Sequence, residues 1–402
     1  MLMDRLSSLS LLQRRILAAV FSLVSLAVVI AYIYRAATYY MMDVEVFQDA
    51  GWALRRGQDL YSEDFPSRSG FRFIYPPFAA LLFYPLTWAG PTTLQIIWTL
   101  ATMAAVWALL WMVATRIRAE RPILLASGLL GVVLLLDPLR ANVLFGQINV
   151  FLALLIVADV LGFLPRKLRG LGIGIAAGIK ITPAAYALVF LMRRDYWAVL
   201  TSFLWFLLTV GIGFIARYQE SIYFWTEEFF ASNRGGAPTY EANQAFSGLL
   251  ARAGVEGSAL SVGIYGFFLF GALAAAFATW SYHRAGYDVT ALAVVALAVS
   301  FAGPYAVSHH WAITMIFFPL LLVLRETWHI IVGLAFFIAH WWAPYHVFID
   351  NPGGVADTMA QWAYGNMQGI MGAILFFGFL AHAVVLCRRP RRVTVATTPI
   401  SA

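Results

Sequence analysis

Asp43-Val-Glu-Val-Phe-Gln-Asp-Ala-Gly-Trp-Ala-Leu-Arg-Arg56 and Phe71-Arg-Phe-Ile-Tyr-Pro-Pro-Phe78 are the stretches of sequence that decide the fold. Both belong to a polar segment, residues 35–92, that separates two apolar runs of membrane length. Within residues 43–56 an apolar stripe recurs at helical spacing (Val46, Phe47, Ala50, Ala53 and Leu54), whereas Asp43, Asp49 and Arg56 fall off it. This pattern predicts an amphipathic helix in the membrane interface, which holds a carboxylate at the level of the lipid headgroups. Segment 35–92 is therefore predicted to be a folded insert.

The composition sets the class of protein. Hydrophobic residues make up 61% of the chain and charged residues only 12%, whereas about a quarter of a soluble domain is charged. The net charge of +7 comes from basic residues at the ends of apolar runs, where they orient helices by the positive-inside rule. No nucleic-acid partner is therefore indicated. Cys387 is the one cysteine, which excludes an intramolecular disulfide and a cysteine metal site.

The apolar runs predict an all-α polytopic membrane protein. Runs long enough to cross about 30 Å of hydrocarbon occur at 16–34, 94–115, 123–140, 148–164, 196–216, 258–280, 289–307 and 367–387, with shorter ones at 311–324 and 327–342. The first lacks a clear cleavage site and is predicted to be a retained span. We expect about ten full transmembrane helices plus a two-helix hairpin, about twelve helices in total, in one domain over residues 1–392. Residues 393–402 are expected to be a disordered cytoplasmic tail.

Residues 170–192 are predicted to form the hairpin. Glycines at 170, 172, 174 and 178 lead to Lys180-Ile-Thr-Pro183, which is expected to break a helix in mid-membrane. A single span would separate the basic residues at 166–169 from those at 193–194, whereas a hairpin keeps them on one side. With the hairpin, 17 basic residues face the cytoplasm and nine face outward, and both termini are cytoplasmic. The polar segments 35–92, 137–149, 217–247, 309–310 and 343–366 then meet at the outer face of the plasma membrane.

Three residues at this face are candidates for binding a phosphate. Lys180 is either a lysine that extends to the interface or the cation of an anion site at the tip of the hairpin. His309 and His310 cannot both point the same way from a helix, so we expect one of them to hydrogen-bond the phosphate. Neither has another His, Cys or acidic residue at helical spacing, so no metal site is predicted.

Other polar side chains are candidates for binding the sugar or the acceptor. Gln147, Asn149, Asn243 and Gln244 lie at the outer ends of spans, where an amide either caps a helix or binds sugar hydroxyls. Tyr75 begins the rigid Tyr75-Pro-Pro-Phe78 stretch, which ends one helix and is expected to position the insert. Asp43 either complements a helix dipole or acts as a base. Asp49 lies more than a turn and a half further on, on a different side of the helix, and is the competing carboxylate.

In order and spacing, several motifs resemble those of glycosyltransferase family 87, which has the GT-C fold. The motifs are Asp43 with Val46-Phe47, Gly57 with Leu60-Tyr61, Tyr75-Pro-Pro-Phe-Ala-Ala, Gly146-Gln-Ile-Asn, Lys180-Ile-Thr-Pro, Asn243-Gln-Ala-Phe-Ser-Gly-Leu and Ser308-His-His-Trp. The resemblance implies an inverting α-1,2-mannosyltransferase of an actinobacterium, which uses polyprenyl-phosphate mannose and a glycolipid acceptor of the phosphatidylinositol mannoside or lipomannan type. It implies Asp43 as the base, and no cofactor.

The chemistry of such a donor needs few groups. A polyprenyl phosphate is a good leaving group, so one base and cations to hold the phosphate suffice, without an obligatory general acid. Two alternatives stay open. A sister enzyme that transfers arabinofuranose or glucose fits the same residues, and a transporter or flippase also contains intramembrane lysines and broken helices. The absence of a visible sequence repeat and the concentration of polar segments on one face argue against the transporter.

Overall fold

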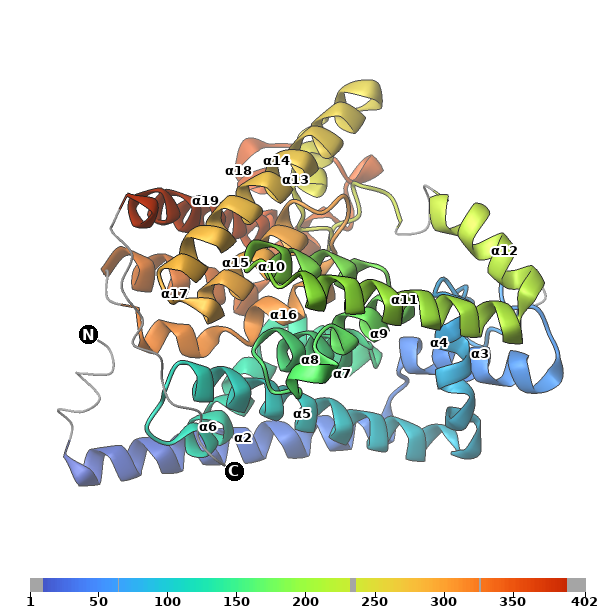
Figure 1. Cartoon of the computed structure of the whole chain (residues 1–402), viewed down its shortest axis with the longest axis horizontal. Coiled ribbons are helices and arrows are strands. Elements are labelled where there is room, and N and C mark those ends of the chain that lie inside the picture. The colour runs from blue at the N-terminus through green and yellow to red at the C-terminus, as the bar shows by residue number, and fades with distance from the viewer. Residues whose placement is uncertain (1–9, 64, 232–235, 325–326, 389–402) are drawn as a thin grey trace.

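A computed structural model describes residues 10–63, 65–231, 236–324 and 327–388, which form an assembly of helices (Figure 1). The expected tail at 393–402 lies outside these ranges. Within them, five helices are long and apolar enough to cross a membrane: α2 (Leu11–Thr38), α5 (Pro91–Arg116), α11 (Tyr196–Ala216), α14 (Gly257–Arg284) and α19 (Met367–Cys387). The chain is therefore an all-α polytopic membrane protein. By length and composition, five helices of the described residues qualify as full spans, or six if a bent pair counts as one span, so the count of about ten stays a prediction.

Several predicted spans are short or broken. The runs at 148–164, 289–307 and 327–342 form α8 (Asn149–Val160), α15 (Asp288–Phe301) and α17 (Thr327–Trp342). The prediction of one helix at 123–140 is wrong, because α6 (Pro122–Leu134) and α7 (Asp137–Phe145) meet at 80°. The break lies at Leu136, whose backbone is extended, and Pro138 begins the next helix without a backbone donor.

The predicted run at 311–324 is also interrupted. It consists of the end of η5 (Ser308–Trp311), then α16 (Ala312–Met315) and η6 (Phe318–Leu322). Pro319 lies in the first turn of η6, where it cannot continue the hydrogen bonding of the preceding helix. The prediction of a continuous helix was wrong here, and the short turns instead carry the half-buried His309-His310 pair.

The insert contains the predicted amphipathic helix, α3 (Met42–Arg56), followed by α4 (Pro77–Phe83) and η1 (Tyr84–Trp88). These elements lie at one end of the molecule, at the right of Figure 1. The apolar stripe of α3 faces inward: Phe47 and Ala50 are fully buried, and the Phe47 ring stacks on Phe83 at 4.5 Å. Gly51 permits this packing, since a Cβ there would lie 2.7 Å from the Phe83 carbonyl oxygen. The insert is thus fixed rigidly against the helices.

Residues 170–192 form the predicted hairpin. The first arm, α9 (Leu171–Ile179), ends at Lys180, and η3 (Thr182–Tyr186) with α10 (Ala187–Met192) forms the second. The two ends of the hairpin meet, because Arg169 Nη1 donates to Asp195 Oδ2 at 2.7 Å. The alternative of a single span is therefore excluded by the geometry.

Glycines allow α9 to pack closely between α8 and α11. A Cβ at Gly172 would lie 2.3 Å from the Leu155 carbonyl oxygen of α8, and one at Gly174 would lie 2.5 Å from the Ser202 carbonyl oxygen of α11. Asp159 of α8 accepts hydrogen bonds from the backbone N–H groups of Gly170 and Ile173, which satisfies the first turn of α9. The glycines therefore serve close helix contact.

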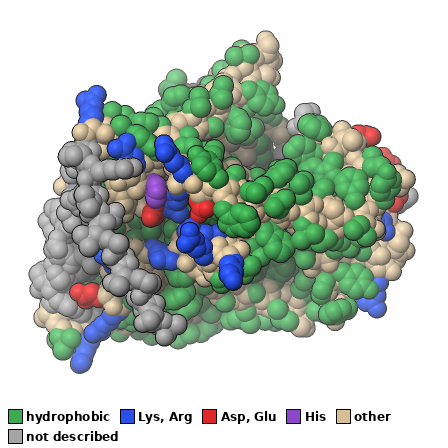
Figure 2. Space-filling model, viewed as in Figure 1, with side chains coloured by type: hydrophobic (Ala, Val, Ile, Leu, Met, Phe, Trp, Pro, Cys, Tyr) green, Lys and Arg blue, Asp and Glu red, His purple; other side chains and the backbone are tan. Residues whose placement is uncertain are grey.

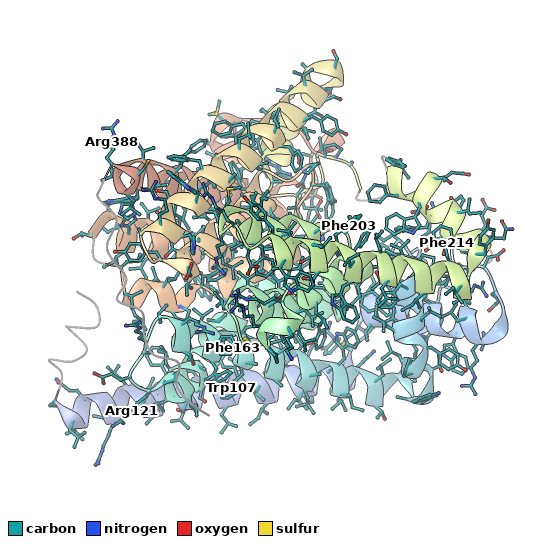
Figure 3. All side chains as sticks on the ribbon, viewed as in Figure 1. Trp107, Arg121, Phe163, Phe203, Phe214 and Arg388 are labelled. Atoms are coloured by element: carbon teal, nitrogen blue, oxygen red, sulfur yellow. The ribbon has the colours of Figure 1, made fainter. Side chains whose placement is uncertain are left out.

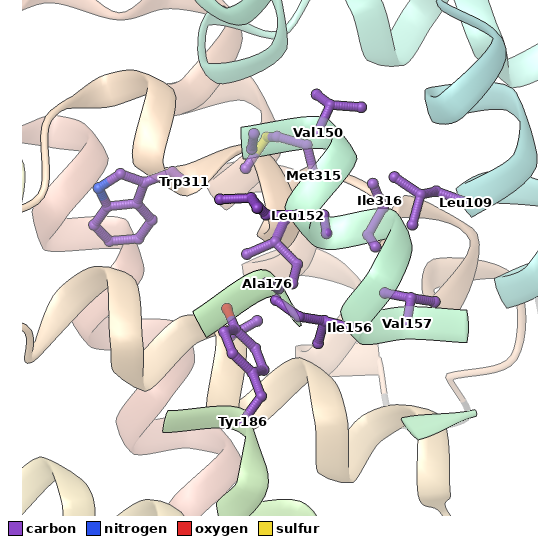
Figure 4. Packing of buried hydrophobic residues seen from close by; sticks show 14 of the residues in the cluster. Leu109, Val150, Leu152, Ile156, Val157, Ala176, Tyr186, Trp311, Met315 and Ile316 are labelled. Carbon is purple, nitrogen blue, oxygen red and sulfur yellow. The ribbon is translucent and has the colours of Figure 1, made fainter. Parts of the chain in front are cut away.

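The hairpin arms, α8 and α16 form the centre of the apolar core. Figure 4 shows Leu152 and Ile156 of α8 beside Tyr186 of η3 and Met315 of α16. Large apolar side chains also cover the outside, as Figure 2 shows in green. On α11, Phe203 is 55% exposed, and it is labelled in Figure 3. Such exposed apolar surface suits contact with lipid.

A charged cluster marks the base of the hairpin. Besides the Arg169–Asp195 pair, Arg193 lies 3.3 Å from Asp288, which is also paired with His283. Figure 2 shows Lys and Arg side chains gathered with acidic residues and a histidine on the left of this face. Lys180 lies at the other end of the hairpin. The hairpin therefore has a charged cluster at its base, and its tip, with Lys180, meets the insert.

Gly172→Ala tests the close packing of the hairpin. Because the added Cβ would overlap the α8 backbone, we expect the variant to lose about 1–3 kcal/mol of stability, measured as a lower midpoint of thermal unfolding in detergent. Gly211→Ala is the matched control, since a Cβ at Gly211 meets nothing within 4 Å. Equal stability of the two variants would contradict the close approach of α9 to α8.

Candidate active site

The tip of the hairpin brings together side chains from four segments. Lys180 Nζ donates to Asn149 Oδ1 at 3.0 Å and lies 3.1 Å from His310 Nε2. It also lies 5.8 Å from the centroid of the Tyr75 ring, in the insert. Lys180 is extended, with φ −148° and ψ 126°, because α9 ends there. The break in the helix thus places a cation at the meeting point of the hairpin, α8, η5 and the insert.

A chain of amides links Lys180 to Asp43. Asn149 Nδ2 donates to Gln147 Oε1 at 3.3 Å, and Gln147 in turn hydrogen-bonds the Asp43 carboxyl. Gly146 makes this approach possible, because its backbone has φ +73° and a Cβ would lie 2.8 Å from Val44 Cβ of α3. Asp43, Gln147, Asn149 and Lys180 therefore form one connected polar group, and α3 supplies its acid.

Asp43 is a buried carboxyl with unused capacity to accept a proton. Its Oδ2 atom is buried and has no hydrogen-bond partner among the described residues. Burial raises the pKa of Asp43 to about 6, although the Gln147 amide and the Lys180 charge act in the opposite direction. A carboxyl titrating near neutral pH in such a place has the properties of a general base.

Asp49 lies in a different environment. Although the sequence pattern placed it off the apolar stripe, it is only 1% exposed. Arg68 covers it: the Arg68 Nε donates to Oδ1 at 2.6 Å, and the Arg68 backbone N–H donates to Oδ2 at 2.9 Å. Arg68 also lies 3.5 Å from Glu45. Through Arg68, Asp49 thus holds the segment that links α3 to α4 against α3. Both of its carboxylate oxygens already accept hydrogen bonds.

The two histidines differ in their contacts. His310 lies on Lys180, whereas the His309 carbonyl oxygen accepts from Asn142 Nδ2 at 2.9 Å and from Asn149 Nδ2 at 3.4 Å. Burial lowers the pKa of His309 to about 3, and it lowers the pKa of His310 well below its usual value, in each case reinforced by Lys180. Both imidazoles are therefore neutral at pH 7. Lys180 supplies the positive charge, and His310 can supply a hydrogen bond.

Asn243 and Gln244 serve as structural anchors. Both are fully buried. Asn243 Oδ1 accepts from the Ala306 N–H at 3.2 Å, and its Nδ2 donates to the Pro238 carbonyl at 2.9 Å. Gln244 Oε1 accepts from the Gly369 N–H at 3.1 Å. These bonds hold separate segments together, and neither amide caps α13 (Phe246–Arg252), the helix that follows, so we leave them out of the sugar site.

A cavity opens beside Lys180. Its lining includes polar side chains (Asn149, Lys180, Thr182, Ser300, Tyr305 and His310) and apolar ones (Leu152, Ile156, Tyr186, Val299 and Ile313). Such a cavity suits a ligand that joins an anionic group to a hydrocarbon chain. Sequence reasoning missed Ser300 and Tyr305; only the position of Tyr305, after Pro304 and shortly before the histidines, was a signal.

Asp43→Asn tests the burial of this carboxyl. Because folding raises its pKa from 3.8 to about 6, ionised Asp43 costs stability above about pH 6, and the cost vanishes below pH 3.8, where both states are protonated. We expect the amide variant to be more stable by about 1–3 kcal/mol near pH 7.5, with a margin that shrinks as the pH falls. Thermal unfolding across this pH range measures it. A variant less stable than the wild type near pH 7.5 would contradict the burial.

Comparisons with known proteins agree on one family. The sequence profile of glycosyltransferase family 87 matches residues 73–304. A polyprenol-phosphate-mannose-dependent alpha-(1-2)-phosphatidylinositol mannoside mannosyltransferase from Mycolicibacterium smegmatis is 30% identical over 364 residues, 81% of each chain. Its namesake from Mycobacterium tuberculosis is 31% identical over 301 residues, 68% of each chain. No solved structure matches the chain. The chain is a membrane glycosyltransferase, and it belongs to glycosyltransferase family 87.

Proposed function

We propose that the protein transfers mannose from polyprenyl-phosphate mannose to a hydroxyl of a phosphatidylinositol mannoside, with inversion and formation of an α-1,2 linkage. The observation that carries the proposal is the buried Asp43 carboxyl, joined through Gln147 and Asn149 to the Lys180 ammonium. The names of the two relatives state the same donor and acceptor class.

The donor phosphate binds at Lys180 and His310. Lys180 is the cation of this polar group, and its hydrogen bonds to Asn149 and His310 hold it in place before substrate arrives. The apolar residues that line the adjacent cavity, which include Leu152, Ile156 and Ile313, accept the first part of the prenyl chain. A donor with a phosphate head and a hydrocarbon tail therefore finds both surfaces in one place.

Asp43 acts as the base. As the acceptor oxygen forms its bond to the sugar C1 atom, the hydroxyl proton passes to Asp43 Oδ2, the oxygen for which the described residues offer no hydrogen-bond partner. The bond between C1 and the phosphate oxygen breaks, and the electron pair leaves with the polyprenyl phosphate, whose charge Lys180 balances. Inversion requires the acceptor to approach C1 opposite the phosphate. The amides of Gln147 and Asn149 lie between the base and the cation, where they can bind sugar hydroxyls, and Tyr75 borders the same space.

The orientation follows from the two ends of the hairpin. Its base carries Arg169, Arg193 and neighbouring basic residues, which the positive-inside rule places in the cytoplasm. The tip and the insert then face the outside of the plasma membrane, where a lipid-linked donor and a glycolipid acceptor can both enter from the bilayer.

The experiment that tests the function is a transfer assay with purified protein, labelled polyprenyl-phosphate mannose and phosphatidylinositol mannoside. Asp43→Asn should reduce turnover by about a hundred-fold to ten-thousand-fold, while Asp49→Asn should lose stability and keep most of its turnover. Wild-type activity should fall as the pH drops through about 6, because Asp43 becomes protonated. An active Asp43→Asn enzyme would refute this base, and transfer of glucose or arabinofuranose in place of mannose would refute the donor.

Variants of the phosphate site test how the donor is held. Removing a charge-assisted contact to phosphate costs about 1.5–3 kcal/mol, so Lys180→Ala should raise the donor KM roughly tenfold or more. His310→Ala should raise it less, and His309→Ala least, because the His310 ring lies 3.1 Å from Lys180 Nζ, whereas His309 meets Asn142 and Asn149 through its carbonyl oxygen. Lys167→Ala is the control, since Lys167 is an exposed lysine at the base of the hairpin. Wild-type donor KM values for Lys180→Ala and His310→Ala would rule out this site.

A further inference from the structure

Asp137 is a buried carboxylate that the proposed reaction does not use. It lies in the first turn of α7 and is 3% exposed. Three side chains donate to it: Arg140 Nη2 at 2.7 Å, the Ser308 hydroxyl, and the Tyr345 hydroxyl at 3.3 Å. An acidic residue that only complemented the dipole of α7 would need neither Ser308 nor Tyr345. Because the three donors come from separate segments, Asp137 joins these segments to one another.

The segments that meet at Asp137 carry the phosphate site. Ser308 begins η5, the turn that contains His309 and His310. Tyr345 lies in η7 (Pro344–Phe348), in the predicted outer segment 343–366. One turn and a half along α7, Asn142 donates to the His309 carbonyl. Helix α7 therefore holds the histidine turn at two points, one at Ser308 and one at His309.

The same helix leads directly to the other half of the site. Gly146 ends α7, and Gln147 and Asn149 follow, which contact Asp43 and Lys180. Helix α7 leads into the amide residues of the site and is hydrogen-bonded to the histidine turn η5. The contact between α7 and η5 therefore fixes the separation between His310 and Asn149, the two residues on either side of Lys180 Nζ. A loose junction would let His310 move relative to Lys180.

We propose that Asp137 is the positioning residue of the donor site: by holding Ser308 and Tyr345 on α7, it fixes the His309-His310 turn in the place where His310 orients Lys180 toward the donor phosphate. This rests on the proposed function for its substrate. An ionised acceptor suits the role, because hydrogen bonds to a charged group are roughly twice as strong as neutral ones. The exposed side of Arg140 leaves part of the charge pair in contact with solvent, which limits the cost of burying the carboxylate.

A double-mutant cycle tests this role. Asp137→Asn keeps the size and removes the charge, and it should lower kcat/KM for the donor about ten- to a hundred-fold, as expected when a binding group is displaced by about 1 Å. If Asp137 acts through the histidine turn, adding Asp137→Asn to His310→Ala should cost much less than it costs alone. Equal losses in the two backgrounds would overturn the proposal, because they would make Asp137 independent of His310.

Ser308→Ala provides a second variant if Asp137→Asn does not fold. It removes one hydroxyl at the same junction, and it should show the same dependence on His310. Asn366→Ala is the matched control: Asn366 is also fully buried and joins distant outer segments through Arg252, without contacting the histidine turn. It should lower stability without raising the donor KM selectively. A selective rise in this variant would overturn the assignment to Asp137.

Hydrogen exchange separates this proposal from the proposed function. The His310 amide donates to the Val307 carbonyl at 2.8 Å and reports on the integrity of the turn. Exchange at residues 306–311 should increase in Asp137→Asn and in Ser308→Ala, but not in Asn366→Ala. If the wild type fails to use polyprenyl-phosphate mannose, the proposed function falls while this measurement still decides the role of Asp137. Unchanged exchange in both junction variants would overturn it.

Discussion

The break in the chain at Lys180 is the constraint on which the active site depends. A lysine in a membrane protein needs partners or water for its charge, and here the end of α9 delivers it to Asn149, His310 and the face of Tyr75. A continuous helix would instead carry residues 184–192 onward along the axis of α9, away from the base of the hairpin, where Asp195 meets Arg169. The glycines of α9 let this short arm lie against the backbones of α8 and α11.

The two aspartates of α3 have different roles: one holds the structure together, and the other is the proposed base. Asp49 is covered by Arg68, which satisfies both of its oxygens and fastens the insert. Asp43 is buried beside a glycine turn, and one of its oxygens has no hydrogen-bond partner in the described part of the chain, an arrangement that lowers stability and raises basicity. Costs of this kind concentrate at functional sites, and here the packing of Phe47 and Gly51 against Phe83 supplies the rigidity that tolerates it.

Sequence patterns predicted the secondary-structure elements better than the long-range contacts of their side chains. The amphipathic helix and the hairpin followed from periodicity and from glycine and proline positions, and Lys180, His310 and Asn149 do meet. The bend between α6 and α7 was missed because the apolar run continues through it. The anchoring of Asn243 could not be foreseen, since its backbone partner Ala306 lies 63 residues away. Likewise, nothing in the spacing of α3 indicated that Arg68, 19 residues on, would cover Asp49.

The central claim is that one site, between the insert and the tip of the hairpin, holds the donor between a cation and a base. The most direct measurement is an electron cryo-microscopy structure of the Asp43→Asn protein with polyprenyl-phosphate mannose bound. The account predicts the phosphate within hydrogen-bonding distance of Lys180 Nζ and His310, with the sugar lying toward residue 43 and the prenyl chain against Leu152 and Ile156. A phosphate bound elsewhere, such as among the arginines at the base of the hairpin, would contradict it.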